Sequence, residues 1–377
     1  RLSEAFREVE QLIQSQASLD EGSSAATIET LRRGAALAER LGHHRTAKQW
    51  LYALVKKCDP RIAARAGLAT GPGEAKADAA REWIDAELRL ARILSIEADV
   101  SPFGHPDQIE AAEEALGAIA NVLAIDPNEP AALKLRPRLL RLIGRINEVA
   151  EALARSVENE KDDALRAEVL FEAALTVAAS RGDERETLRY LTASLEADPT
   201  RREVHEARAR LLRQLGEWRS YVSACRDWVR VCEGKEAAKV AHEAAIALAH
   251  RLDDSAGAIK LLAEALNHDG RHRGALEMLA NLAEAKSDHA LAARALEGLV
   301  DVVDADDRPH IVTRRAKMVL AGGRVDEAAA LLADPSVASD PEALEARIRI
   351  ALERGDIAAA AQTLDTLETV IRNAAGA

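Results

Sequence analysis

The sequence predicts an all-α fold, a right-handed α-solenoid of antiparallel helix pairs. A short basic motif occurs four times, and its first arginine always lies eight residues before a glycine. The four copies are Arg136-Pro137-Arg138 before Gly144, Arg208-Ala209-Arg210 before Gly216, Arg315-Ala316-Lys317 before Gly323 and Arg347-Ile348-Arg349 before Gly355. Repetition at about 35 residues is typical of stacked helix pairs. Alanine and leucine, which are strong helix formers, dominate, and valine and isoleucine form no period-two runs that would predict strands.

The turn inside each helix pair is predicted from one anchor residue. The anchors are Gly42, Gly144, Gly182, Gly216, Asp253, Ser287, Gly323 and Gly355. Glycine suits the left-handed backbone that ends a helix, and Asp and Ser are acceptable turn residues. Most anchors are followed by an alanine, expected where the two helices cross, at Ala47, Ala258, Ala292, Ala328 and Ala360. A leucine follows at a helical interval, at Leu51, Leu191, Leu262, Leu296, Leu332 and Leu364.

These positions resemble the tetratricopeptide repeat (TPR) family, a helix–turn–helix unit of about 34 residues. The best match spans 171–199: Phe171 is the bulky first-helix residue, Gly182-Asp183 the turn, Leu191 the second-helix packing residue and Pro199 the stop. The resemblance, of a divergent bacterial type, covers most of 23–374. It implies a single TPR-like solenoid of about nine helix pairs over residues 1–377.

Three stretches depart from the regular repeat. Residues 71–108 combine the breaker Gly71-Pro72-Gly73, a long helix predicted over 74–97 and a loop over 101–106. This region predicts an insertion or an irregular joint between two superhelical segments. Pro137 lies inside a first helix, which it should kink or break. Residues 1–18 predict a lone helix.

Composition excludes several classes of protein. The net charge of −12 argues against a general nucleic-acid binder, which must neutralise phosphates.

The three cysteines, Cys58, Cys225 and Cys232, cannot all pair, so we expect a reducing, cytoplasmic compartment. Cys225 and Cys232 are expected as core residues on one face of a helix. Neither a membrane span nor a signal peptide is predicted.

The sequence carries no motif typical of catalysis or of cofactor binding. The stretch 71–76 lacks the order of a phosphate-binding loop, and His242-Glu243-Ala244-Ala245-Ile246 ends in isoleucine where a zinc helix needs its second histidine. His268 and His272 flank Asp269-Gly270, which disfavours a helix that would align them. We therefore expect no catalytic residue, no cofactor, no metal site and no enzymatic activity.

The resemblance implies that a partner binds on the concave surface lined by the first helices. The repeat register places eight residues there: Lys134, Arg138, Arg141, Glu206, Arg210, Arg213, Lys317 and Arg349. Arg138 with Arg141, and Arg210 with Arg213, would form basic spots that grip carboxylates, an acidic peptide or a phosphorylated segment. The alternative is that these side chains pair with acidic neighbours or simply solvate the surface. The first arginine of each basic motif is expected to lie between helices, with its guanidinium group reaching water or a carboxylate.

The main hypothesis is therefore a non-enzymatic protein–protein interaction scaffold that holds a segment of a partner protein or peptide in its groove. An alternative is a sensory or regulatory domain of a larger signalling or effector protein, since the chain opens at Arg1 in a helical pattern. A weaker one is a helical-repeat RNA binder, which the acidic charge and the lack of a regular base-reading pair oppose. The partner's identity, the binding face and the oligomeric state stay open.

Trp83 is the aromatic residue most suspected of exposure, although a core position is favoured.

Overall fold

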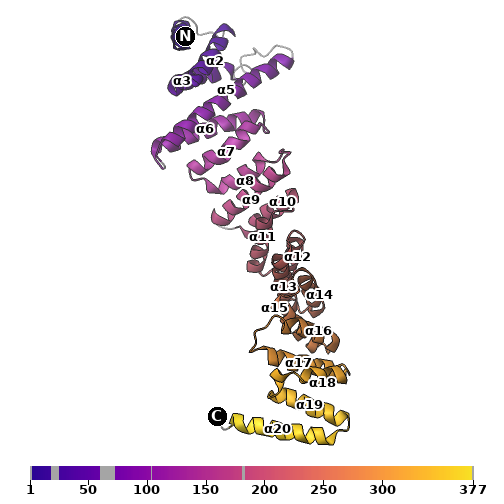
Figure 1. Cartoon of the computed structure of the whole chain (residues 1–377). Coiled ribbons are helices and arrows are strands. Elements are labelled where there is room, and N and C mark those ends of the chain that lie inside the picture. The colour runs from indigo at the N-terminus through magenta and orange to yellow at the C-terminus, as the bar shows by residue number, and fades with distance from the viewer. Residues whose placement is uncertain (1, 18–24, 60–72, 103, 181–182, 376–377) are drawn as a thin grey trace. The chain divides into compact units, whose positions relative to one another are not determined.

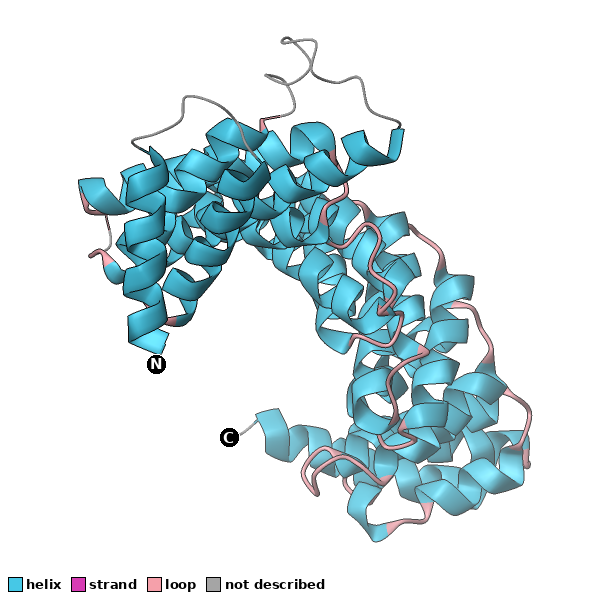
Figure 2. Ribbon diagram, turned by 90° about the horizontal axis from the view of Figure 1, so that it is seen from above, coloured by secondary structure: helices cyan, strands magenta, loops and turns pink. Residues whose placement is uncertain are grey.

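In the computed structural model every regular element among the described residues is a helix (Figure 1; Figure 2). The described residues are 2–17, 25–59, 73–102, 104–180 and 183–375. The chain divides into two compact units, residues 1–198 and residues 199–377.

In the first unit each helix packs against the next one along the chain. The elements are α1 (Leu2–Ala17), α2 (Ala25–Arg40), α3 (His44–Cys58), α5 (Gly73–Val100), α6 (Pro106–Ile125), α7 (Pro130–Leu142), α8 (Ile146–Ser156), α9 (Asp163–Ser180) and α10 (Glu184–Ala197). The pairs are α2 with α3, α5 with α6, α7 with α8, and α9 with α10. We call the earlier member of a pair its first helix and the later member its second helix.

The second unit repeats this arrangement. Its elements are α11 (Arg202–Leu215), α12 (Trp218–Val229), α13 (Gly234–Arg251), α14 (Ser255–His268), α15 (Arg273–Ala285), α16 (His289–Val300), α17 (Arg308–Ala321), α18 (Val325–Leu332), the short 3₁₀ helix η1 (Pro335–Val337), α19 (Pro341–Glu353) and α20 (Ile357–Ala375). Contacts between successive helices are the defining feature of a solenoid. The predicted fold class is therefore confirmed within each unit.

The predicted turns have the backbone that they need. Positive φ angles occur at Gly42, Gly144, Gly216, Gly323 and Gly355, and also at the two anchors that are not glycine, Asp253 (53°) and Ser287 (58°). The anchor Gly182 lies outside the described residues. The following helix is often started by an aspartate whose carboxylate accepts backbone N–H groups of the first turn, as at Asp183, Asp254 and Asp288. Such caps satisfy donors that a helix N-terminus leaves free.

The crossing alanines are buried, as predicted, and so are five of the six leucines. The exception is Leu364, which is 47% exposed on α20. Its packing was predicted from register alone, and that prediction is wrong. In the described part of the chain α20 packs on α19.

The structure of residues 73–102 and 104–108 agrees closely with the helix and loop predicted for this irregular region. The helix expected over 74–97 is α5, and the loop after it ends at Pro106, the first residue of α6. The side chain of Gln108 joins this loop to the end of α5. Its Nε2 donates to the Ala98 carbonyl at 3.1 Å, and its Oε1 accepts from the Gly104 N–H at 2.8 Å. The core position favoured for Trp83 is confirmed, because its side chain is only 1% exposed.

Two further local predictions can be compared with the structure. The lone helix over 1–18 is α1. The expected break at Pro137 does not occur, because α7 runs through this buried proline. Gly71 and Pro72 lie outside the described residues. The prediction of a single solenoid with a joint at 71–108 stays a prediction.

The cysteines are free thiols, and Cys225 and Cys232 are buried. The expectation that both lie on one helix is wrong, because α12 ends at Val229 and Cys232 lies in the turn beyond it. Within the described ranges, no group of three or more His, Cys, Asp and Glu side chains is placed to hold a metal ion. No helix in those ranges combines the length and apolarity that a bilayer crossing demands.

Candidate functional site

The predicted groove residues of the first unit are exposed on the first helix α7, and neighbouring elements supply a carboxylate to each. The ion pairs are Lys134–Glu160 at 3.7 Å, Arg138–Asp99, and Arg141–Glu172 at 2.5 Å. Asp99 belongs to α5 and Glu172 to α9, the first helices on either side of α7. The basic spot is therefore interleaved with acidic side chains.

The second unit shows the same interleaving. The ion pairs are Arg210–Glu206 at 2.6 Å, Arg213–Glu243 at 3.9 Å, Lys317–Glu342 at 2.8 Å and Arg349–Glu353 at 3.3 Å. Two of them cross from one first helix to the next, from α11 to α13 and from α17 to α19. The hydrogen bond from Lys317 lowers the pKa of the Glu342 carboxyl.

Pairing with acidic neighbours, the alternative reading of the sequence, is thus the arrangement found for all seven basic residues. Exposed ion pairs contribute only about 0–1 kcal/mol each, because water screens both charges. They hold the long side chains in defined positions. An external carboxylate can exchange with the internal one at little cost.

Three of the predicted residues meet at one pocket in the second unit. Glu206, Arg210 and Arg213 of α11 line a space of about 320 Å³ together with residues of α12 and α13. Its other lining residues are Ala209, Tyr221, Trp228, Glu236, Lys239, Val240 and Glu243. Ala209, Tyr221 and Val240 are buried and Trp228 is half-buried, whereas most charged residues are exposed. We call this the α11–α13 pocket; it has an apolar, aromatic base and a charged rim.

The rim carries equal numbers of acidic and basic groups, three of each. Glu243 is the shared acceptor, since it pairs with Arg213 and lies 3.5 Å from the hydroxyl oxygen of Tyr221, which donates to it. Burial raises the pKa of Tyr221, so that hydroxyl stays a neutral donor at physiological pH. Among the rim residues that the structure describes, Lys239 is the one cation without an ion pair. It is the group most available to a carboxylate from outside.

Part of this pocket was missed from the sequence. Tyr221 and Trp228 form the pocket base, and neither was predicted as a site residue. Lys239 and Glu236 were not singled out. The register itself could have found the opposite wall, because Glu243 stands as far before its turn residue Asp253 as Glu206 stands before Gly216.

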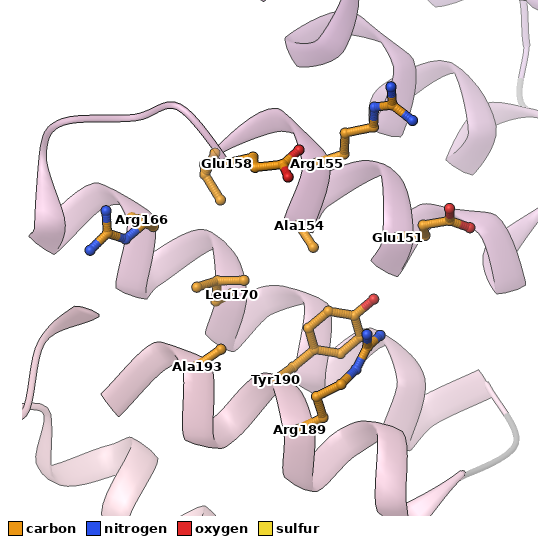
Figure 3. A pocket seen from close by; sticks show the side chains of 10 residues that line it. Glu151, Ala154, Arg155, Glu158, Arg166, Leu170, Arg189, Tyr190 and Ala193 are labelled. Atoms are coloured by element: carbon orange, nitrogen blue, oxygen red, sulfur yellow. The ribbon is translucent and has the colours of Figure 1, made fainter. Parts of the chain in front are cut away.

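A second pocket of about 390 Å³ lies among α8, α9 and α10 of the first unit. Figure 3 shows Arg189 and Tyr190 coming from α10 and Arg155 and Glu151 from α8. The Arg189 guanidinium carbon lies 4.6 Å from the centroid of the Tyr190 ring, which is a cation–π contact. None of these residues was predicted as a site residue from the sequence.

The buried thiol of Cys225 on α12 is not a reactive nucleophile. Burial raises the pKa of Cys225 to about 11, so the thiol is protonated at neutral pH. A protonated thiol is a poor nucleophile. Cys225 therefore acts as a small core residue of α12.

A pH dependence is expected from His205 on α11. The ring is buried, and its Nε2 lies 2.8 Å from the Pro199 carbonyl oxygen, which accepts from it. Burial lowers the pKa of His205 below its ordinary value of 6.5. Above pH 6.5 the neutral ring is favoured in both the folded and the unfolded state, so the folded state keeps its full stability. Below that pH the unfolded chain binds a proton at His205 more readily than the folded chain does, which stabilises the unfolded state. The urea midpoint of unfolding should therefore fall as the pH drops through this range.

The matched variant is His205→Gln, which keeps a side-chain donor but does not titrate. Its urea midpoint should fall less than that of the wild type between about pH 7.5 and about pH 5.5. The remaining fall is expected partly from His242, whose pKa burial also lowers. Identical falls in the two proteins would contradict the role of His205.

Comparison with known proteins gives likeness of fold only. No protein-family model matches the chain, and no curated protein matches it. Similar solved structures include a tetratricopeptide repeat protein from Parabacteroides merdae, at 16% identity over 64% of this chain and 93% of that one with a TM-score of 0.30. YrrB, described as a TPR protein with an unusual peptide-binding site, is 14% identical over 51% of this chain and 89% of its own, with a TM-score of 0.29. The TPR domain of P58(IPK) is 15% identical over 91% and 92%, with a TM-score of 0.25.

All three neighbours are TPR structures. Identities and scores this low do not carry over a partner or a binding residue. The repeat fold of this chain rests instead on its own successive helix packing and on its left-handed turns.

Proposed function

We propose that the chain is a non-enzymatic interaction scaffold that holds a segment of a partner protein against the exposed face of its first helices. The observation that supports this most is the α11–α13 pocket. There an aromatic base lies under charged side chains, three of which the repeat register predicts on the binding surface. Apolar bases with polar rims are typical of binding sites.

The chemistry of the pocket favours a segment with an acidic side chain next to an apolar one. A carboxylate would pair with Lys239, and could replace Glu206 as the partner of Arg210. The apolar side chain would lie against Tyr221 and Trp228, since aromatic rings supply much contact area at low entropic cost. The complementary charges would select the partner more than they would raise its affinity.

The proposal extends to the other predicted groove residues. In the first unit these are Lys134, Arg138 and Arg141, and in the second unit Lys317 and Arg349. Each is exposed or half-exposed and held by a carboxylate that an acidic partner could replace.

Peptide selection on the full chain tests this function. Short peptides displayed as a random library should be enriched for sequences with Asp or Glu beside an aromatic or aliphatic residue. For a selected peptide, Arg210→Glu combined with Lys239→Glu should raise the dissociation constant at least about tenfold, because two charge-assisted contacts become repulsive. Fluorescence anisotropy of the labelled peptide measures this change.

The matched control is Lys235→Glu. Lys235 is exposed on α13 but does not line the pocket, so its variant should bind the peptide as the wild type does. Enrichment of basic peptides, or unchanged binding by the double variant, would rule out the proposed site.

A further inference from the structure

In three of the four copies of the basic motif, the first arginine donates to an acceptor group on a neighbouring helix. The contacts are Arg208–Asp227 at 3.1 Å, Arg315–Glu297 at 2.7 Å, and Arg347 Nε to the Leu332 carbonyl oxygen at 2.9 Å. In each copy the acceptor lies on a second helix, α12, α16 or α18. The guanidinium groups are thereby neutralised or hydrogen-bonded between the helices.

The fourth copy, Arg136 on α7, is different. Within the described ranges its half-buried side chain has no ion pair and no hydrogen bond. Asp227 stands 19 residues after Arg208, and Arg155 stands at the same spacing after Arg136. The position that supplies the carboxylate in one repeat therefore supplies a second guanidinium in the other.

Arg136 and Arg155 line one pocket of about 400 Å³ between α6, α7 and α8. We call it the α6–α8 pocket. A third arginine, Arg145, also lines it and is compensated by Glu148 at 2.5 Å. The remaining wall is apolar, formed by Leu116, Ala120, Leu123, Ala124 and Leu140. The pocket thus holds two uncompensated positive charges against an apolar wall.

Nearby carboxylates do not cancel these charges. Glu151 and Glu158 stand about one helical turn before and after Arg155, and both line the neighbouring pocket of Figure 3. Neither forms an ion pair with Arg155 among the described residues. Two like charges that share a pocket repel each other, and a bound anion would turn this repulsion into attraction.

We propose that the α6–α8 pocket binds a phosphate monoester that carries an apolar group. The phosphate would bridge Arg136 and Arg155, since the planar guanidinium fork matches phosphate oxygens in a bidentate manner. A dianionic phosphate matches the excess of two positive charges better than a carboxylate does. The apolar group would lie on Leu116, Leu123 and Leu140. This site is independent of the α11–α13 pocket and of the proposed partner segment.

Isothermal titration calorimetry on the full chain tests the proposal, with n-butyl phosphate and inorganic phosphate as probes. The wild type should bind n-butyl phosphate saturably, and several-fold more tightly than inorganic phosphate because of the apolar wall. Arg155→Asp should weaken this binding at least about tenfold. The same variant restores the charge pattern of Arg208 with Asp227, so its thermal unfolding midpoint should equal or exceed that of the wild type.

Two further variants decide the remaining cases. Arg136→Gln should also weaken the binding of n-butyl phosphate about tenfold, which covers the case in which Arg155→Asp folds poorly. Arg185→Asp makes the same charge change at an exposed arginine of α10 outside the pocket, and should bind as the wild type does. Absence of saturable binding, equal affinity for the two phosphates, or full binding by Arg155→Asp or Arg136→Gln would overturn the proposal.

Discussion

Leu296→Ala will lower the free energy of unfolding by about 2–5 kcal/mol. Leu296 is fully buried in α16, where its side chain fills the space between successive helices. Removing three carbon atoms from such a position loses their burial and leaves a cavity that close-packed neighbours refill only in part. Urea unfolding followed by circular dichroism measures the loss.

Leu364→Ala is the matched control, because Leu364 occupies the same repeat position in α20 but is 47% exposed. Its removal should cost less than about 1 kcal/mol, since little apolar area leaves a buried environment. Similar losses at the two sites would mean that repeat position, rather than burial, determines the cost.

Ala258→Leu will destabilise the second unit by about 1–3 kcal/mol. Ala258 is fully buried near the start of α14, where that helix crosses α13. The added side chain has no room there, so the two helices must move apart or adopt strained rotamers. The thermal unfolding midpoint should fall accordingly.

The control for overpacking is Ala263→Leu, an exposed position on the same helix. Leucine and alanine have similar helix propensities, so this change should alter the unfolding midpoint only slightly. If Ala258→Leu were as mild as Ala263→Leu, the crossing at Ala258 would not require a small residue.

The local structure could be predicted from the sequence because it depends on near neighbours. A turn needs a left-handed residue, and the spacing of candidate residues located these turns even where Asp253 and Ser287 replace glycine. Leu364 could not be predicted from register, since the register gives the helix face of a residue but not whether another helix covers that face. The core position favoured for Trp83 is found even though its irregular region offers no repeat register.

The candidate site could be predicted only in part, for a similar reason. The exposure of Arg138 and Arg210 follows from helix periodicity. The Glu206 partner of Arg210 follows as well, because the two residues lie four positions apart on one helix. The Asp99 partner of Arg138 does not, because it lies on a different helix. The α11–α13 pocket needs side chains from three helices, and its existence depends on how these helices pack.

The left-handed turns at Asp253 and Ser287 also bear on how such repeats are detected. What the helix pair requires there is a conformation, and glycine is only the residue that adopts it at the least cost. A profile scores residue identity at each position, so each turn built from another residue removes part of the signal and none of the architecture. A chain can therefore change its turn residues one at a time and still keep its helix pairs.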